Sequence, residues 1–147
     1  MRDFDAQGLY RVINSNGDDH ISASELTAFL TSNFVKDVTE TDCLEIIREF
    51  DSSNDNSMQY DEYLNLVMPA ANANLRDYCL YGRRSSGGAV SAQAIMICVR
   101  ILEGEMRLTA KKRECRIALA AHADHEAQKT FNMMSQGRYE VSVPALI

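Results

Sequence analysis

The chain has 147 residues, a formal net charge of −6 and an apolar fraction of 46%, which suit one compact domain or two small lobes with a real core. The longest uncharged apolar run, residues 89–99, is too short to cross a bilayer, and the first residues lack the apolar segment of a secretory signal. Cys43, Cys79, Cys98 and Cys115 form no CxxC pair, so we expect reduced thiols in a cytoplasmic protein rather than a disulfide framework or a zinc site.

Charge is divided unevenly along the chain. Residues 1–68 hold fourteen acidic and four basic side chains, whereas residues 69–147 hold seven acidic and eleven basic ones. The acidic half is suited to concentrating cations. For the basic half two explanations remain open, an acidic partner surface or ordinary solvated helix faces.

Four helices are predicted in the first half from apolar residues that recur at helical spacing. Thr39 followed by Asp42 resembles a capping box that begins the third helix, and Pro69 should end the fourth. The four apolar stripes are Ala6, Leu9, Tyr10 and Ile13; Leu26, Phe29 and Leu30; Cys43, Ile46, Ile47 and Phe50; and Tyr63, Leu66 and Val67.

Two twelve-residue segments separate these helices, loop 1 (residues 14–25) and loop 2 (residues 51–62). Each carries oxygen-bearing side chains at its positions 1, 3, 5 and 9, an apolar residue at position 8 and a glutamate at position 12. A hard cation such as Ca²⁺ takes six to eight oxygen ligands from a flexible loop. Calcium binding is therefore the leading hypothesis.

The repeat of helix, oxygen-rich loop and helix, 37 residues apart from Glu25 to Glu62, resembles a paired EF-hand lobe of the calmodulin type over residues 1–68. The resemblance implies an all-α fold in which Ile21 and Met58, both at position 8, form a short β-bridge. It also implies two sets of calcium ligands. In loop 2 these are Asp51, Ser53, Asp55, the Ser57 carbonyl, Gln59 directly or through water, and Glu62; in loop 1 they are Asn14, Asn16, Asp18, the His20 carbonyl, Ser22 and Glu25.

Loop 2 is expected to be the stronger site. Three of its ligands are acidic against two in loop 1, so we expect dissociation constants of about 10⁻⁵ M for loop 2 and about 10⁻⁴ M, or no binding, for loop 1. Position 6 requires a left-handed backbone, which Asn56 tolerates. At Asp19 the same conformation would cost roughly 1–2 kcal/mol.

The second half is predicted to be helical as well. We expect a short helix over residues 75–84, a break at residues 85–88, and helix over residues 90–121 that Gly104 or Thr109 interrupts. Asp124 should cap a further helix. One face of the long segment is expected to hold Val90, Ala94, Ile97, Cys98, Ile101 and Leu102, and the last helix carries Ala127, Thr130, Phe131 and Met134.

The last segment is interpreted as a degenerate hand that has lost its ligands. Residues 135–145 place Val141 near the bridge position but supply no closing acid, and residues 90–121 would be its partner hand with a collapsed loop. The expected organisation is a paired lobe (1–68), a linker with a short helix (69–89) and an apparently truncated degenerate lobe (90–147). This second half is similar to degenerate EF-hand pairs of protist and ciliary EF-hand proteins.

No nucleotide-binding, hydrolase or metalloprotease motif occurs in the sequence, which predicts a non-catalytic protein. Two functions remain open: a calcium-sensitive protein that docks a helix of a partner, and a constitutive structural subunit of a larger assembly with weak or vestigial calcium binding. We expect a protein partner, no nucleic acid and no membrane span. The expected location is the cytoplasm, with cytoskeletal or ciliary association under the second function.

Overall fold

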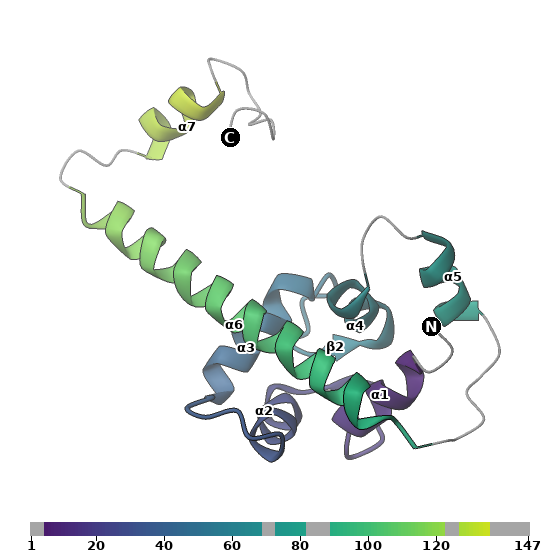
Figure 1. Ribbon diagram of the computed structural model, residues 1–147. Coiled ribbons are helices and arrows are strands. Elements are labelled where there is room, and N and C mark those ends of the chain that lie inside the picture. The colour runs from purple at the N-terminus through teal and green to yellow at the C-terminus, as the bar shows by residue number, and fades with distance from the viewer. Residues whose placement is uncertain (1–4, 69–72, 82–88, 123–126, 136–147) are drawn as a thin grey trace. The chain divides into compact units, whose positions relative to one another are not determined.

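The computed structural model describes residues 5–68, 73–81, 89–122 and 127–135, which are mostly helical (Figure 1). This confirms the expected all-α fold with one short bridge. In chain order the elements are α1 (Ala6–Ile13), β1 (His20–Ile21), α2 (Ala23–Ser32), α3 (Glu40–Phe50), β2 (Met58–Gln59), α4 (Tyr60–Val67), α5 (Ala73–Tyr81), α6 (Ala92–Ala120) and α7 (Ala127–Ser135).

Local sequence signals fix where the first helices begin. The Asp5 carboxylate accepts a hydrogen bond from the Gly8 N–H at 2.8 Å and caps α1. The predicted capping box of α3 is confirmed, since the Thr39 side chain accepts from the Asp42 N–H while Asp42 accepts from Thr39. Helix α4 ends at Val67, and Pro69 lies outside the described residues.

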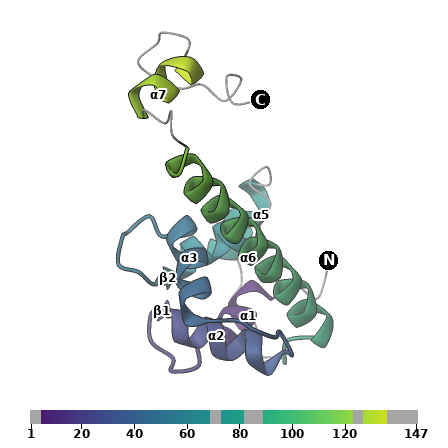
Figure 2. The same cartoon turned by 90° about the vertical axis from the view of Figure 1, so that its left-hand side faces the viewer.

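The four predicted stripes meet in one apolar core formed by α1 to α4 and the bridge. All members of the stripes are buried except Phe50 and Val67, which are half-buried and pack against the core. The bridge is antiparallel and pairs Ile21 with Met58, as predicted. Figure 2 shows β1 and β2 side by side, so the two loops form one continuous rim of the lobe.

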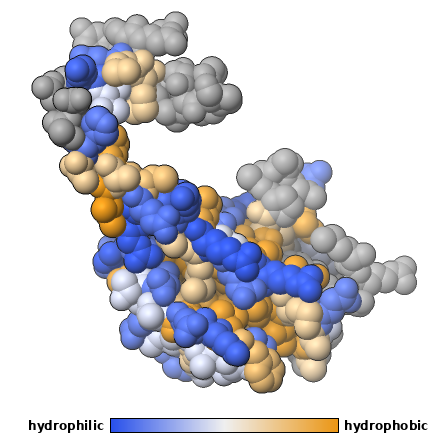
Figure 3. Space-filling model, turned by 60° about the vertical axis from the view of Figure 1, so that its left-hand side comes forward, coloured by the Kyte–Doolittle hydropathy of each residue, from blue (hydrophilic) through white to orange (hydrophobic). Residues whose placement is uncertain are grey.

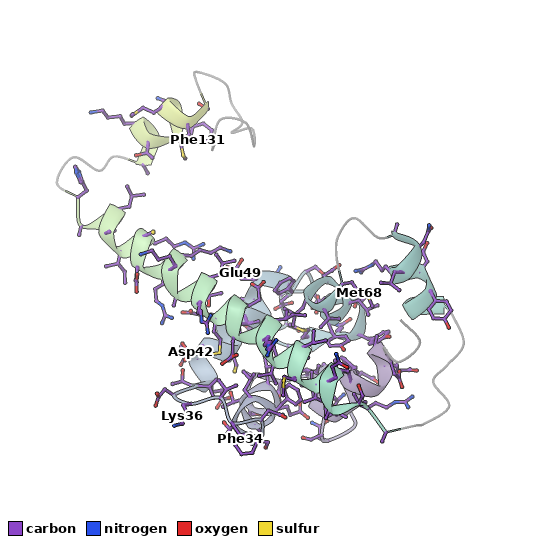
Figure 4. All side chains as sticks on the ribbon, viewed as in Figure 1. Phe34, Lys36, Asp42, Glu49, Met68 and Phe131 are labelled. Carbon is purple, nitrogen blue, oxygen red and sulfur yellow. The ribbon has the colours of Figure 1, made fainter. Side chains whose placement is uncertain are left out.

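Residues 33–39 connect α2 to α3. Phe34 and Asp37 have positive φ angles of 66° and 58°, a conformation that costs a non-glycine residue roughly 1–2 kcal/mol. Val35 and Val38 pack against the core, whereas the Phe34 side chain is 92% exposed and projects from the lobe (Figure 4). The packing of Val35 and Val38, each next to a left-handed residue, offsets the strain at Phe34 and Asp37.

The chain divides into two compact units, Met1–Ala110 and Lys111–Ile147. Helix α6 is continuous over Ala92–Ala120. The expected interruption at Gly104 or Thr109 was therefore wrong, as was a collapsed loop inside this segment. A single glycine costs a helix only about 1 kcal/mol, which the rest of a long helix outweighs.

The buried face of α6 also differs from the predicted one. Cys98 and Leu102 are buried as expected, but Ile97 is 51% exposed and Val99 is buried in its place. Helix α7 coincides with the predicted last stripe, while Asp124 and the expected degenerate loop up to residue 145 lie outside the described residues. Among the residues that the structure describes, no helix is long and apolar enough to cross a membrane.

Candidate metal centre

The glutamate that closes loop 2 ties the two ends of the loop together. One carboxylate oxygen of Glu62 accepts hydrogen bonds from the Ser52 N–H (2.8 Å), the Ser52 hydroxyl (2.9 Å) and the Ser53 N–H (3.1 Å). The other accepts from the Gln59 N–H at 3.0 Å. Burial disfavours the charge on Glu62, but these donors outweigh burial and lower its pKa. A buried carboxylate, 1% exposed, is thus held ionised between the start and the end of the loop.

The first carboxylate of loop 2 organises the turn. One oxygen of Asp51 accepts from the Ser53 hydroxyl (3.1 Å) and the Asp55 N–H (3.3 Å), and the other accepts from the Asn56 N–H at 2.8 Å. Burial opposes ionisation of Asp51, yet the hydrogen bonds, led by that of Asn56, lower its pKa. Asp51 therefore faces the middle of the loop with both oxygens in their acceptor form.

Asp55 accepts hydrogen bonds from the next two predicted ligands, Ser57 and Gln59. Its carboxylate accepts from the Ser57 hydroxyl at 2.6 Å, the Ser57 N–H at 2.9 Å and the Gln59 side-chain amide at 3.2 Å. The hydrogen bonds from Ser57, first from its side chain and then from its backbone, lower the pKa of Asp55 to about 2. Loop 2 therefore presents three ionised carboxylates at neutral pH.

Backbone shape distinguishes the two loops. In loop 2, Asn54 and Asn56 both have φ of 60°, as predicted for Asn56, and the Arg48 guanidinium donates to the Asn56 side chain at 3.0 Å. In loop 1 the left-handed residue is Gly17, with φ of 76°. The predicted strain at Asp19 was wrong, since Asp19 is not among the residues with positive φ. Loop 1 makes its turn at the glycine, where it costs little.

Loop 1 closes in the same way as loop 2 at its glutamate. Glu25 accepts from the Asn16 N–H (3.1 Å) and the Ser15 hydroxyl (3.4 Å) on one oxygen, and from the Ser22 N–H (3.0 Å) and hydroxyl (2.8 Å) on the other. Burial disfavours its charge, but the Ser22 donors, followed by Asn16, lower the pKa of Glu25. The closing carboxylate of loop 1 is therefore ionised and hydrogen-bonded in the same way as that of loop 2.

Two further residues of loop 1 are linked to the start of its bridge strand. Asp18 accepts from the His20 N–H at 3.0 Å and exchanges hydrogen bonds with Asn16 at 2.8 Å. The His20 backbone bond is the main cause of the lowered pKa of Asp18. The middle of loop 1 is thus folded, with one carboxylate available.

The first residue of loop 1 behaves unlike its counterpart in loop 2. The Asn14 side-chain oxygen accepts from the Gly17 N–H at 3.0 Å, and its amide nitrogen donates to the Asp18 carbonyl at 2.5 Å. Because an N–H donor cannot ligate a cation, the amide nitrogen of this buried side chain serves only to close the loop. At the equivalent position of loop 2, both carboxylate oxygens of Asp51 are acceptors.

The donor set of loop 2 fits a hard cation. It consists of oxygen atoms alone, from carboxylates, hydroxyls, an amide and a backbone carbonyl. Within the described part of the chain, however, no three Asp, Glu, His or Cys side chains converge as a metal-holding group. The carboxylates of loop 2 are directed at N–H and O–H donors of the loop, and binding would exchange part of these hydrogen bonds for cation contacts. The ligand assignments of both loops stay predictions.

An aromatic cluster beneath the rim was missed in the sequence. The Tyr10 hydroxyl lies 3.0 Å from the Asp19 carbonyl of loop 1 and 3.3 Å from the Met58 carbonyl of loop 2, and it donates its single hydrogen between these two acceptors. Its ring lies 5.2 Å from those of Tyr60 and Tyr63. Burial is the main cause that raises the pKa of Tyr10 to about 12. A tyrosine on an apolar stripe needs a partner for its hydroxyl, and that signal could have placed Tyr10 between the loops.

Replacing Asn14 by aspartate should strengthen loop 1. Asn14→Asp adds a third acidic ligand and removes the amide donor, so we expect a gain of about tenfold in its calcium affinity, or about 1.4 kcal/mol. Without calcium the variant should be less stable, because the new carboxylate faces the Asp18 carbonyl. Asn74→Asp adds the same charge at an exposed position of α5 and serves as the control in calorimetric titrations. Equal gains in the two variants would mean that charge alone, and not ligation, changes the affinity.

Acid should weaken the calcium-free lobe. Asp51, Asp55 and Glu62 have lowered pKa values in the folded chain, so their contribution to stability is complete above the unfolded values of 3.8 and 4.5. It is lost as pH falls through the folded values, which reach about 2 for Asp55. Circular dichroism should show a melting temperature that is level above about pH 5 and falls between about pH 4.5 and about pH 2. In Asp55→Asn this fall should be smaller, and an unchanged profile would refute the role of Asp55.

Comparison with known protein families agrees with this geometry. The family described as the EF-hand domain pair matches residues 3–68, which include both loops, the bridge and all four helices of the lobe. This domain pair is typical of calcium-binding regulatory proteins. Residues 3–68 of this chain are an EF-hand pair.

Proposed function

We propose that this chain is a non-catalytic calcium-binding protein whose EF-hand pair docks a helix in a calcium-sensitive way, with loop 2 as the dominant site. The observation that carries the proposal is the ring of acceptors in loop 2. Glu62, Asp51 and Asp55 have lowered pKa values, and their hydrogen bonds order the loop around them. A loop that is already ionised and shaped loses little entropy on taking up a cation.

Glu62 also offers a route from the loop to the apolar core. It lies in the first turn of α4, and its carboxylate holds both the start of the loop, at Ser52 and Ser53, and the N–H of Gln59. If a cation draws the Glu62 carboxylate inward, it would pull the start of α4 with it. That helix contributes Tyr63, Leu64 and Leu66 to the core. EF-hand sensors use such a helix movement to open an apolar face.

Calorimetric titration of the full chain with Ca²⁺ and with Mg²⁺ tests the proposal. We expect one site with a dissociation constant of about 10⁻⁵ M for Ca²⁺, and weaker binding of Mg²⁺, whose octahedral geometry suits the loop less well. The chain contains no tryptophan and six tyrosines, so tyrosine emission, to which the cluster of Tyr10, Tyr60 and Tyr63 contributes, can follow the same titration. No Ca²⁺ binding up to millimolar concentration would refute the proposal.

A second candidate function is a constitutive structural subunit of a cytoskeletal or ciliary assembly. The geometry of loop 1 favours it, since Asn14 closes that loop by hydrogen bonds to Gly17 and Asp18 without a cation. A lobe held in this way would bind its partner at any calcium concentration. An unchanged tyrosine emission and an unchanged circular dichroism spectrum upon saturation with Ca²⁺ would support this function over the first.

A further inference from the structure

The apolar core of the lobe does not consist of the EF-hand pair alone. Cys98, Val99 and Leu102 of α6 belong to the same cluster of buried residues as the four lobe helices, with exposed fractions of 2%, 8% and 0%. Figures 1 and 2 both show the first half of α6 beside the lobe. Leucine at zero exposure is an inserted side chain and not one that rests on a surface.

The first half of α6 has two clearly different faces. On one face the residues recur every three or four positions and are buried or half-buried, and on the other Met96, Ile97 and Leu108 are 57%, 51% and 48% exposed. This periodicity of burial is that of a helix packed along one side in an apolar groove, and Figure 3 shows hydrophobic side chains beside hydrophilic ones on the face of the molecule that it draws. The inward residues are Ile95, Cys98, Val99, Leu102, Met106 and Thr109.

The approach to α6 is also packed against the lobe. A Cβ built on Gly8 of α1 would lie 3.1 Å from the Val90 side chain, and Val90 packs against the core two residues before α6 begins. On the other side, Leu75 of α5 packs against the same core. The Arg76 guanidinium donates to the Asp61 carbonyl at 3.1 Å and to the Asn65 side chain. The chain is therefore attached to the lobe before α6 as well as along it.

We propose that residues 92–109 are an internal ligand of the EF-hand pair and occupy the groove in which a partner helix would dock. This inference rests on the proposed function for the docking of a helix, and it names the helix that the lobe holds first. An external partner must displace this segment. The full chain should then bind amphipathic helices less tightly than a variant in which α6 is released.

Calcium and α6 should bind the lobe cooperatively. A lobe that admits the Leu102 side chain at zero exposure has an accessible groove, and cation binding favours the open form of an EF-hand pair. By linkage, each ligand raises the affinity for the other by the same factor. Typical couplings correspond to a factor of about 5 to 150, so a docked α6 would strengthen binding at loop 2.

Thiol labelling of the full chain measures the docking directly. Cys98 is buried in the proposed interface, while Cys115 is exposed on the same helix. Burial also raises the pKa of the Cys98 thiol to about 12. Followed site by site by mass spectrometry, maleimide labelling of Cys98 should be at least about a hundredfold slower than that of Cys115, because it needs local opening. Saturating Ca²⁺ should slow Cys98 further, by about 5- to 150-fold, and leave Cys115 unchanged.

A matched pair of leucine variants tests what the groove holds. In the full chain, Leu102→Asp places a charge at the buried position and Leu108→Asp places the same charge at the exposed one. A fluorescent synthetic peptide of residues 92–110 should bind the Leu102→Asp protein at least about tenfold more tightly than it binds the wild type or Leu108→Asp. Circular dichroism checks the fold of each variant. Leu102→Ala and Val99→Ala, which are milder, should raise the labelling rate of Cys98 even if Leu102→Asp misfolds.

The outcomes separate this inference from the proposed function. Equal labelling rates for Cys98 and Cys115, equal peptide binding by the two leucine variants, or no response of Cys98 labelling to Leu102→Ala and Val99→Ala would each overturn the internal ligand. If the chain binds calcium but the slow labelling of Cys98 does not change with calcium, the internal ligand is retained. That result would overturn the cooperativity and the calcium-sensitive function. Loss of Cys98 protection with normal calcium binding would remove only the internal ligand.

Discussion

Glu62→Gln is expected to remove most of the calcium binding of the full chain. The substitution deletes one of three acidic ligands of loop 2, and it replaces an oxygen that faces N–H donors by an amide group that cannot accept from all of them. We expect the affinity to fall by at least about a hundredfold, or about 2.7 kcal/mol. Without calcium, the unsatisfied buried donors should also cost about 1–3 kcal/mol of unfolding free energy. Titration calorimetry and urea unfolding provide the two measurements.

Glu25→Gln is the matched control, because Glu25 closes loop 1 through the same pattern of donors. It should destabilise the calcium-free fold to a similar extent and yet leave most of the measured calcium binding in place. The pair of variants therefore separates the structural part of the closing glutamate from its part in ligation. The opposite ranking of the two affinities would show that loop 1 is the dominant site.

Ile21→Ala is expected to cost about 2–5 kcal/mol of unfolding free energy. Ile21 is fully buried and pairs with Met58 in the bridge that joins the two loops. Truncation leaves a cavity beneath both loops, so calcium affinity should fall together with stability. Urea unfolding at neutral pH measures the first effect, and titration calorimetry of the folded variant measures the second.

Ile117→Ala makes the same chemical change at a side chain that is 64% exposed. Exposed positions usually respond within about 0.5 kcal/mol in either direction. The difference between the losses of unfolding free energy in the two variants therefore reports the contribution of burial at Ile21. Similar losses at Ile21 and Ile117 would contradict the placement of the bridge in the core.

Much of the first lobe could be predicted because its signals are local. Helical stripes, the capping box at Thr39 and the spacing from Glu25 to Glu62 each depend on residues a few positions apart. Backbone geometry converts such spacing directly into faces and turns. The pairing of Ile21 with Met58 was implied by the resemblance to a paired EF-hand lobe, in which the eighth residues of the two loops lie opposite each other.

Two predictions from the sequence were wrong because local preferences did not decide the backbone conformation. Asp19 was expected to be strained, but it does not have a positive φ angle, and Gly17 is the left-handed residue of loop 1. Gly104 was one of two expected breaks in the helix, yet α6 continues through it. Local propensities of about 1 kcal/mol are easily outweighed by the hydrogen bonds and packing of a long helix.

The EF-hand pair, its two oxygen-rich loops and the greater number of acidic ligands in loop 2 could all be recognised in the amino-acid sequence. Three further features became apparent only in the folded chain: the donor that Asn14 turns into loop 1, the Tyr10 hydroxyl that lies between the two loops, and the insertion of Leu102 into the lobe. The contacts of Tyr10 and Leu102 depend on which groups from distant parts of the chain come together, and the contact of Asn14 depends on the backbone shape of the folded loop. The exposed fraction of a side chain and its hydrogen-bond partners are set by these contacts in the folded chain, so the spacing of residues along one segment does not predict them.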